Sequence, residues 1–159
     1  MGAIKGYKTL TPMPYVKVWL HIVWSTKNRI PFLKPEIRPQ VFQHMRNNAK
    51  KKGIFLDFIN GWEEHVHALV SLGTEQTIAD IVRLMKGESS HWINNEGLTK
   101  TKFGWQNDYF CVGVSESMLE ATREYIKNQE HHHSRRTFEQ EFELMLKKFG
   151  FQRFEDSWD

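Results

Sequence analysis

The first regular pattern along the chain is an alternation of hydrophobic positions, which follows a lead-in of 14 residues with two glycines and two prolines. The alternating side chains are Val16, Val18, Leu20 and Ile22. Successive side chains of a β-strand point to opposite faces, so this alternation predicts a strand over about residues 15–25. A turn with two prolines is expected next, over residues 28–35.

Four segments have the periodicity of helices. Between positions 36 and 52 apolar side chains recur every fourth residue, and Gly53 follows as a C-terminal cap. These side chains are Ile37, Val41, Met45 and Ala49. A second helix opens at Thr77 and extends to about residue 94. Two more are expected near the C-terminus, one from Ser115 or Ser117 to about Gln129 and an amphipathic one over about residues 137–149.

Three further strands are predicted over residues 54–62, 65–72 and 105–115. The first two form a hairpin, and a loop precedes the third. The order β-α-β-β-α-β, followed by two helices, is that of an α+β protein with a ferredoxin-like split β-α-β sandwich. We therefore expect an antiparallel sheet with helices on one face and additional C-terminal helices, in a single domain over residues 1–159 with its core at about 15–131.

Composition narrows the class of protein. The 159 residues suit one domain, and the content of 40% hydrophobic and 13% aromatic residues is enough to build a core, which excludes a disordered chain. A single cysteine, Cys111, excludes an intramolecular disulfide and favours a reducing compartment. No apolar run approaches the ~18 residues of a membrane span, and no signal peptide is evident, so we expect a soluble, cytoplasmic protein with no membrane partner. A net charge of +3 permits nucleic-acid binding but does not require it.

A histidine pair and a tyrosine–glutamine pair are the candidates for chemistry. His65 and His67 flank Val66 in a predicted strand, so their side chains share one face and can hold a divalent metal; a structural pair of half-buried histidines is the alternative. Tyr125 and Gln129 lie one helical turn apart, so the Gln129 carbonyl oxygen can complete the metal site with Tyr125 beside it. The alternative for this pair is a core-edge tyrosine and a surface glutamine.

Five residues are candidates for DNA contact. Trp24, Asn28 and Arg29 follow or end the first strand, where an aromatic ring and a cation can read single-stranded or hairpin DNA. Arg135 and Arg136 carry forked donors that suit phosphate groups.

Other notable residues have a structural interpretation as the favoured one. Trp105 is expected in the core, Glu63 and Glu64 in a turn, and Lys50–Lys52 at a solvated helix end. The triplet His131–His133 is expected to contact the DNA backbone or to end a helix, and metal ligation is the less favoured alternative.

Five motifs, spread from about Tyr15 to Phe149, together resemble one protein family. They are HIVWSTKNRIPFL, EEHVHALVSL, IVRLMKGESSHWIN, FGWQNDYFCVGVS and EYIKNQEHHHSRRTF. In these motifs the chain resembles the small insertion-sequence transposases with a single catalytic tyrosine and a histidine–hydrophobic–histidine (HUH) metal motif. The REP-associated tyrosine transposases are related to that family.

The resemblance implies a role for each residue of the candidate site. His65 and His67 would be the HUH ligands, Gln129 the third ligand, and Tyr125 the nucleophile that forms a 5′-phosphotyrosine and frees a 3′-hydroxyl. It also implies Mg²⁺ or Mn²⁺ as cofactor, single-stranded DNA with hairpin ends as substrate, and a homodimer joined through sheet edges. The alternatives are a non-catalytic or domesticated nucleic-acid-binding protein of the same fold and a replication-initiator HUH nuclease.

Overall fold

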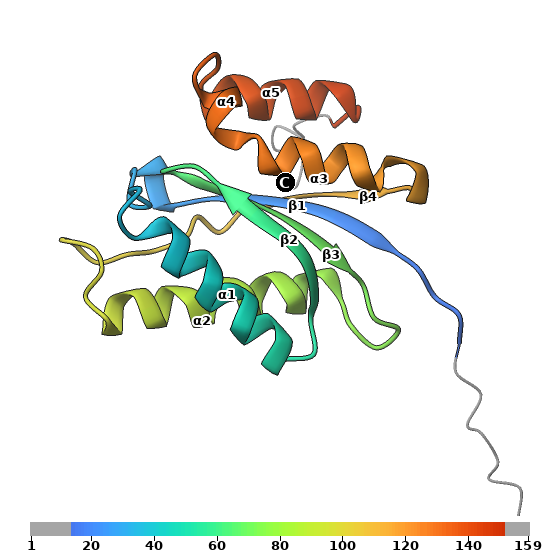
Figure 1. Ribbon diagram of the computed structural model, residues 1–159, viewed down its shortest axis with the longest axis horizontal. Coiled ribbons are helices and arrows are strands. Elements are labelled where there is room, and N and C mark those ends of the chain that lie inside the picture. Colours follow the sequence, from blue (N-terminus) through green and yellow to red (C-terminus); the bar gives the residue numbers. More distant parts are fainter. Residues whose placement is uncertain (1–13, 152–159) are drawn as a thin grey trace, which may run out of the picture.

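The computed structural model describes residues 14–151, and its centre is one antiparallel sheet of four strands (Figure 1). The strands lie in the order β2-β3-β1-β4, and every neighbouring pair is antiparallel. They are β1 (Trp19–Ser25), β2 (Phe55–Gly61), β3 (His65–Ser71) and β4 (Phe110–Val114). This arrangement confirms the predicted α+β class and the antiparallel sheet of the ferredoxin-like type.

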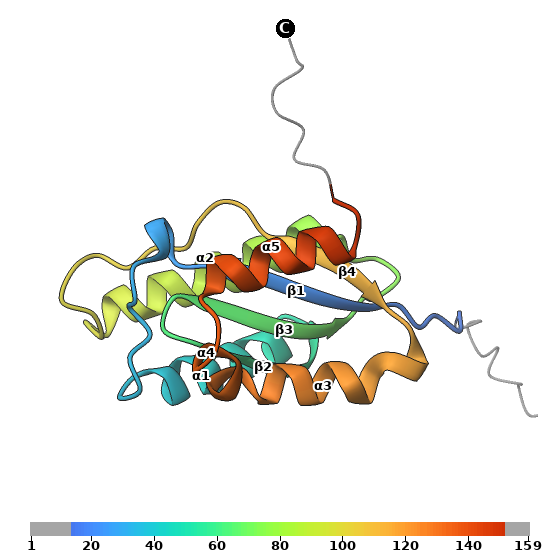
Figure 2. The same ribbon diagram turned by 90° about the horizontal axis from the view of Figure 1, so that it is seen from above.

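Helices cover both faces of the sheet. α1 (Arg38–Lys51) and α2 (Ile78–Asn95) lie on one face, whereas α3 (Leu119–Lys127), the short α4 (Gln129–His133) and α5 (Phe138–Lys148) lie on the other (Figure 1). Seen from above, α5 lies along β1 and α3 lies nearer to β2, with β3 between them (Figure 2). None of the helices between residues 14 and 151 has both the length and the hydrophobicity needed to cross a membrane.

β3 contributes to both layers because its side chains alternate. Val66 and Ala68 are buried in the larger core, between the sheet and helices α1 and α2. His65 and His67 face the opposite side, which α3 and α5 cover, and both are fully buried. The larger core also contains residues of β1, α1 and α2, among them Ile22, Val41, Met45, Ile81 and Ile93.

Two sets of polar contacts attach α3 to β2, and α3 ends earlier than predicted. Arg123 forms an ion pair with Asp57, with an Nε–Oδ2 distance of 2.7 Å. The Asn60 side-chain amide donates to the carbonyl oxygens of Ile126 and Lys127 at 3.0 and 3.1 Å. The helix expected to continue to Gln129 therefore ends at Lys127, because carbonyls of its last turn bond to a strand instead of to a following turn.

Two predicted strands are shorter in the structure. β1 begins at Trp19 instead of residue 15, since its pairing with β3 starts with Trp19 opposite Ser71, the last residue of β3. β4 begins at Phe110 instead of residue 105. Trp105 forms an isolated bridge with Thr26, and its indole nitrogen donates to Ser89 Oγ at 2.9 Å inside the core, where this residue was expected.

The packing of the central strand gives a stability prediction. Ile22 is 0% exposed, so Ile22→Ala should lower the free energy of unfolding by about 2–5 kcal/mol, through lost burial and the cavity left behind. Val16 precedes β1 and is 49% exposed, so Val16→Ala should change it by no more than about 0.5 kcal/mol. Urea unfolding of both variants provides the measurement, and equal effects would contradict the assigned core.

Candidate metal and tyrosine site

His65 and His67 lie at the centre of a cluster of buried polar side chains. A contact at Nδ1 of each ring determines which ring nitrogen faces this cluster. Glu64 Oε1 lies 2.8 Å from His65 Nδ1. Because a carboxylate only accepts hydrogen bonds, Nδ1 carries the proton, and Nε2 of the neutral ring has a free lone pair. His67 Nδ1 lies 2.9 Å from His21 Nε2. When His67 donates this hydrogen bond, its own Nε2 likewise has a free lone pair. Partners of this kind orient imidazoles that bind metals.

Gln129 brings a carbonyl oxygen to these nitrogens. Its Nε2 donates to the Tyr125 carbonyl oxygen at 3.2 Å, which turns Oε1 to within 3.1 Å of His65 Nε2. Gln129 Oε1 and His65 Nε2 are both electron-rich, and a cation bound by both atoms would stabilise this close approach. His67 Nε2 is also buried without a hydrogen-bond partner among residues 14–151. The donor set His65, His67 and Gln129 therefore fits a divalent cation.

Helix α5 brings a buried carboxylate, Glu141, into the same cluster. Its Oε1 lies 3.4 Å from His67 Nε2, and its Oε2 lies 3.7 Å from His65 Nε2 and 3.2 Å from His133 Nε2. Ligand atoms of His65, His67 and Glu141 all lie within 4.8 Å of one another. Burial would raise the pKa of Glu141, but His133, His67 and the Tyr125 hydroxyl together hold that pKa well below its usual range, so the side chain is ionised.

Tyr125 lies beside the histidines and contacts the same carboxylate. Its ring centroid is 5.6 Å from that of His67, and its hydroxyl donates a hydrogen bond to Glu141 Oε1. Burial, followed by the charge of Glu141, raises the pKa of Tyr125 above its usual value, so the phenol is protonated at neutral pH. If Tyr125 reacts as a nucleophile, its proton must therefore leave during the reaction.

Glu141 was missed in the sequence, although a signal was present. Phe138, Glu141 and Met145 follow helical spacing on the buried side of α5, where an acidic residue is unusual unless it has partners. The sequence of α5 was interpreted only as an amphipathic helix. A carboxylate within its apolar positions could have marked Glu141 as a candidate.

Of the histidines outside the HUH pair, His21 was not predicted at the site, and His133 was expected there only in the less favoured alternative of metal ligation by His131–His133. His21 and His67 meet because β1 and β3 pair with Val23 opposite His67, a register that no local pattern gives. His133, expected at DNA or at a helix end, places Nε2 3.2 Å from His65 Nε2. His132 lies against Tyr125, with ring centroids 4.7 Å apart.

The three arginines expected to contact DNA line one cavity. Arg29, Arg135 and Arg136 line a hollow of about 590 Å³, together with Glu64 and His133 of the cluster. All three arginines are exposed. This cavity therefore connects the three exposed arginines to the histidine cluster.

Asn28 and Trp24 differ in what they can contact. Asn28 is exposed in a 3-10 turn, η1 (Lys27–Arg29), where it adopts a positive φ of 55°. Trp24 is 1% exposed and lies in the larger core, its ring edge-on to that of Trp105. The expected DNA contact of Trp24 is corrected accordingly: alternation along β1 turns this side chain to the face of Ile22, and its ring has no free face on which a base could stack.

A second cavity borders the cluster at Glu141. It measures about 620 Å³ and is bounded by β4, α3 and α5. Tyr125, Glu141, Arg136 and Lys148 line it, along with apolar side chains such as Leu144. Arg136 therefore borders both cavities that adjoin the cluster.

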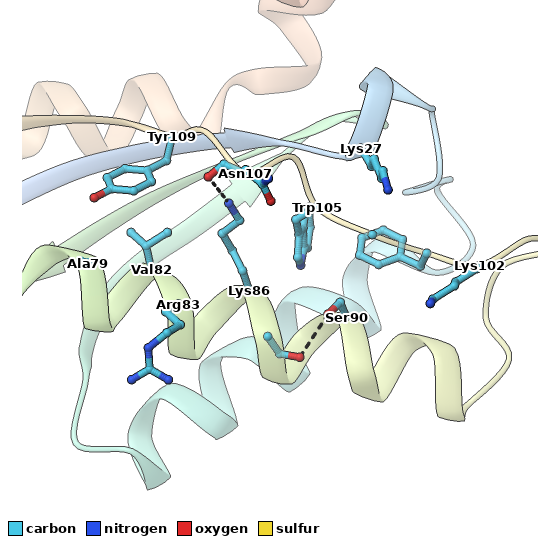
Figure 3. A pocket seen from close by; sticks show the side chains of 13 residues that line it. Lys27, Ala79, Val82, Arg83, Lys86, Ser90, Lys102, Trp105, Asn107 and Tyr109 are labelled. Carbon is cyan, nitrogen blue, oxygen red and sulfur yellow. Dashed lines mark hydrogen bonds between the residues drawn. The ribbon is translucent and has the colours of Figure 1, made fainter. Parts of the chain in front are cut away.

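A third cavity, of about 690 Å³, lies against α2, on the face of the sheet away from Tyr125 (Figure 3). Lys27, Arg83, Lys86 and Lys102 contribute cationic side chains to it. Lys86 donates to the backbone carbonyl oxygens of Gln106 and Asn107, so part of this charge stabilises the loop before β4. This basic surface is separate from the one beside the histidines.

Comparison with known proteins gives the family. The family model described as "Transposase IS200 like" matches residues 14–129, a segment that contains His65, His67, Tyr125 and Gln129. This chain belongs to the IS200-like transposase family. The transposase is also 27% identical over 114 residues to the ISDra2 transposase TnpA of Deinococcus radiodurans, which covers 69% of this chain and 81% of that protein. The family expected from the motifs is thereby confirmed.

Two solved structures have a similar fold. A crystal structure of a Deinococcus radiodurans R1 protein assigned as a transposase gives a TM-score of 0.59 at 25% identity, covering 81% of this chain and 98% of that one. A REP-associated tyrosine transposase bound to a REP hairpin gives 0.58 at 14% identity, covering 84% of this chain and 74% of that one. At that identity the second comparison supports the fold alone.

Burial of the imidazoles predicts how the stability of the transposase depends on pH. Burial lowers the pKa of His67 from 6.5 to about 4, and burial together with His67 lowers that of His21 to about 3. Unfolding therefore takes up protons below pH 6.5, so stability should fall as the pH drops from 7 to 5, by up to about 2 kcal/mol for each imidazole. Urea unfolding in EDTA tests this expectation. His21→Gln should show a smaller loss, and an unchanged slope would contradict the assignment.

Proposed function

We propose that this transposase is a metal-dependent endonuclease and strand-transferase for single-stranded DNA, with Tyr125 as its nucleophile. One observation carries the proposal: the Tyr125 hydroxyl contacts a carboxylate that is within 3.4 Å of His67 Nε2, in the cluster that also holds His65 and Gln129. Membership of a transposase family supports DNA as the substrate. The chemical roles follow the residue types, since a phenol oxygen is the nucleophile and the imidazoles are metal ligands.

His65, His67 and Gln129 would hold Mg²⁺ or Mn²⁺, which when bound neutralises charge on the scissile phosphate. The Tyr125 oxygen forms a bond to phosphorus while the bond from phosphorus to the 3′ oxygen breaks. The phenolic proton is released, and the departing oxygen becomes a 3′-hydroxyl after gaining one. Burial and Glu141 raise the pKa of Tyr125, and hydrogen bonding to Gln129 together with the charge of Arg136 opposes that rise.

The covalent intermediate explains why a side chain, not water, would attack. A phosphotyrosine ester keeps the energy of the original phosphodiester, so a 3′-hydroxyl can later attack it and rejoin two strands without a nucleotide cofactor. Hydrolysis would lose that energy and leave broken ends. Strand transfer therefore follows from the same tyrosine chemistry.

The proposed partners are DNA and a second copy of the chain. The proposed substrate is a hairpin-containing single strand, by analogy with the structural neighbour that is bound to a REP hairpin. The homodimer stays a prediction: β4 lies at an edge of the sheet, and an edge strand has the backbone groups that pairing requires.

Tyr125→Phe tests the nucleophile. Removal of the phenolic oxygen should abolish the metal-dependent covalent protein–DNA adduct, a loss of at least about 10³-fold, while DNA affinity changes little. Denaturing gels with labelled hairpin strands from the DNA flanking the gene provide the measurement. Tyr109→Phe, which removes a hydroxyl at the distant cavity of Figure 3, is the matched control and should keep the adduct.

Two results would contradict this assignment. An adduct formed by Tyr125→Phe would mean that another residue is the nucleophile. Tight DNA binding without any adduct in the wild type, with either metal, would favour the non-catalytic DNA-binding protein.

A charge-matched pair of variants tests the DNA surface. Replacing Arg135 and Arg136 by Ala should weaken single-strand binding, by about tenfold near 0.1 M salt, and reduce the salt dependence by about 0.7 in log–log slope per lost phosphate contact. Replacing Arg83 and Lys102 by Ala removes the same charge at the distant cavity and should have a smaller effect. Fluorescence anisotropy across a salt series measures both. A larger loss of DNA affinity in the variant with Arg83 and Lys102 replaced would indicate that DNA binds on the face of α2.

A further inference from the structure

The role of Glu141 goes beyond the ligand set considered so far. It lies on α5, outside the segment 14–129 that the family model matches. Its side chain is nonetheless 7% exposed and in contact with the nucleophile and with both HUH histidines. A carboxylate is held this deep only where cations or hydrogen-bond donors stabilise it.

The two oxygens of Glu141 have different surroundings. Oε1 accepts the hydrogen bond from the Tyr125 hydroxyl. Oε2 is buried and has no hydrogen bond of good geometry within residues 14–151, and the same is true of His67 Nε2. Oε2 has His133 Nε2 at 3.2 Å as a neighbour, and a cation bound between the carboxylate and His67 Nε2 would stabilise both buried electron-rich atoms.

The spacing of the donor atoms agrees with coordination of one ion. Ligands about 2.1 Å from a shared cation, at angles near 90–110°, lie about 3.0–3.5 Å from one another. The distance from His65 Nε2 to Gln129 Oε1 is 3.1 Å. Glu141 Oε2 lies 3.7 Å from His65 Nε2, and Glu141 Oε1 lies 3.4 Å from His67 Nε2. The carboxylate thus occupies a position that a fourth ligand would take after a small contraction.

We propose that Glu141 is a fourth protein ligand of the divalent cation, binding through Oε2, and that it positions Tyr125 through Oε1. One carboxylate then links the metal to the nucleophile, and α5 becomes part of the active site. A negatively charged oxygen suits Mg²⁺ or Mn²⁺ better than a purely neutral donor set does. This inference rests on the proposed function, because it needs the cation that His65, His67 and Gln129 would hold.

Manganese binding to the full-length protein tests the inference without relying on cleavage. Mn²⁺ affinity is measured by electron paramagnetic resonance and calorimetry for the wild type, His67→Ala, Glu141→Gln and Glu141→Ala. Glu141→Gln keeps the shape and an acceptor for Tyr125 but loses the charge, so Mn²⁺ binding should weaken at least about tenfold. Glu139→Gln removes an exposed carboxylate from the same helix and should leave the affinity unchanged.

Thermal unfolding with EDTA and with Mn²⁺ separates ligation from folding. Mn²⁺ should raise the unfolding midpoint of the wild type and of Glu139→Gln, and raise that of Glu141→Gln much less. If Glu141 only stabilised the fold, Glu141→Gln would lower the midpoint in EDTA while the Mn²⁺-induced shift stayed at the wild-type size. That result would overturn the inference.

The remaining outcomes distinguish this inference from the proposed function. Wild-type binding that His67→Ala abolishes and Glu141→Gln leaves intact would overturn the role of Glu141 and keep the HUH metal site. Tighter binding of Mn²⁺, or more adduct, in Glu141→Ala would show that the carboxylate blocks the site, and would also overturn it. No Mn²⁺ binding by the wild type would overturn the metal site itself.

Discussion

The two-residue period of β3 is the constraint on which the rest of the molecule depends. Val66 and Ala68 bury their side chains in the core with α1 and α2, so His65 and His67 must turn to the opposite face. A slip of one residue would put imidazoles into an apolar core and expose aliphatic side chains at the site. The stability of the core therefore fixes the orientation of the candidate metal ligands.

A buried polar cluster of this kind has to be satisfied from several directions. Glu64 and His21 contact the outer nitrogens of the histidines, whereas Gln129 and Glu141 approach the inner ones. These partners come from β1, the turn before β3, α4 and α5. Because an unpaired buried charge is costly, each element is held where its polar group is needed, and the C-terminal helices are positioned by chemistry as well as by packing.

The sequence predicted what is local and missed what is tertiary. Alternation placed His65 and His67 on one face, and helical spacing brought Tyr125 and Gln129 together even though the helix breaks at Asn128, since Gln129 still bonds to the Tyr125 carbonyl. Glu141 and His21 join the cluster only through the packing of α5 and the register of β1, which no single segment specifies. Trp24 differs from expectation because its alternation with Ile22 along β1 turns its ring into the larger core, away from any DNA-binding surface.

The two cavities that border the cluster have a topological consequence. Helix α5 covers the cluster and borders both cavities, one of which is also bounded by β4 and α3 and the other by Arg29 and the segment before α5. A closed ring would admit a strand only by threading from a free end. A helical cover with two openings can receive an internal stretch of a long polymer, and it can let one product end depart while the other stays attached. The cover over the site is thus compatible with a substrate that has no nearby end.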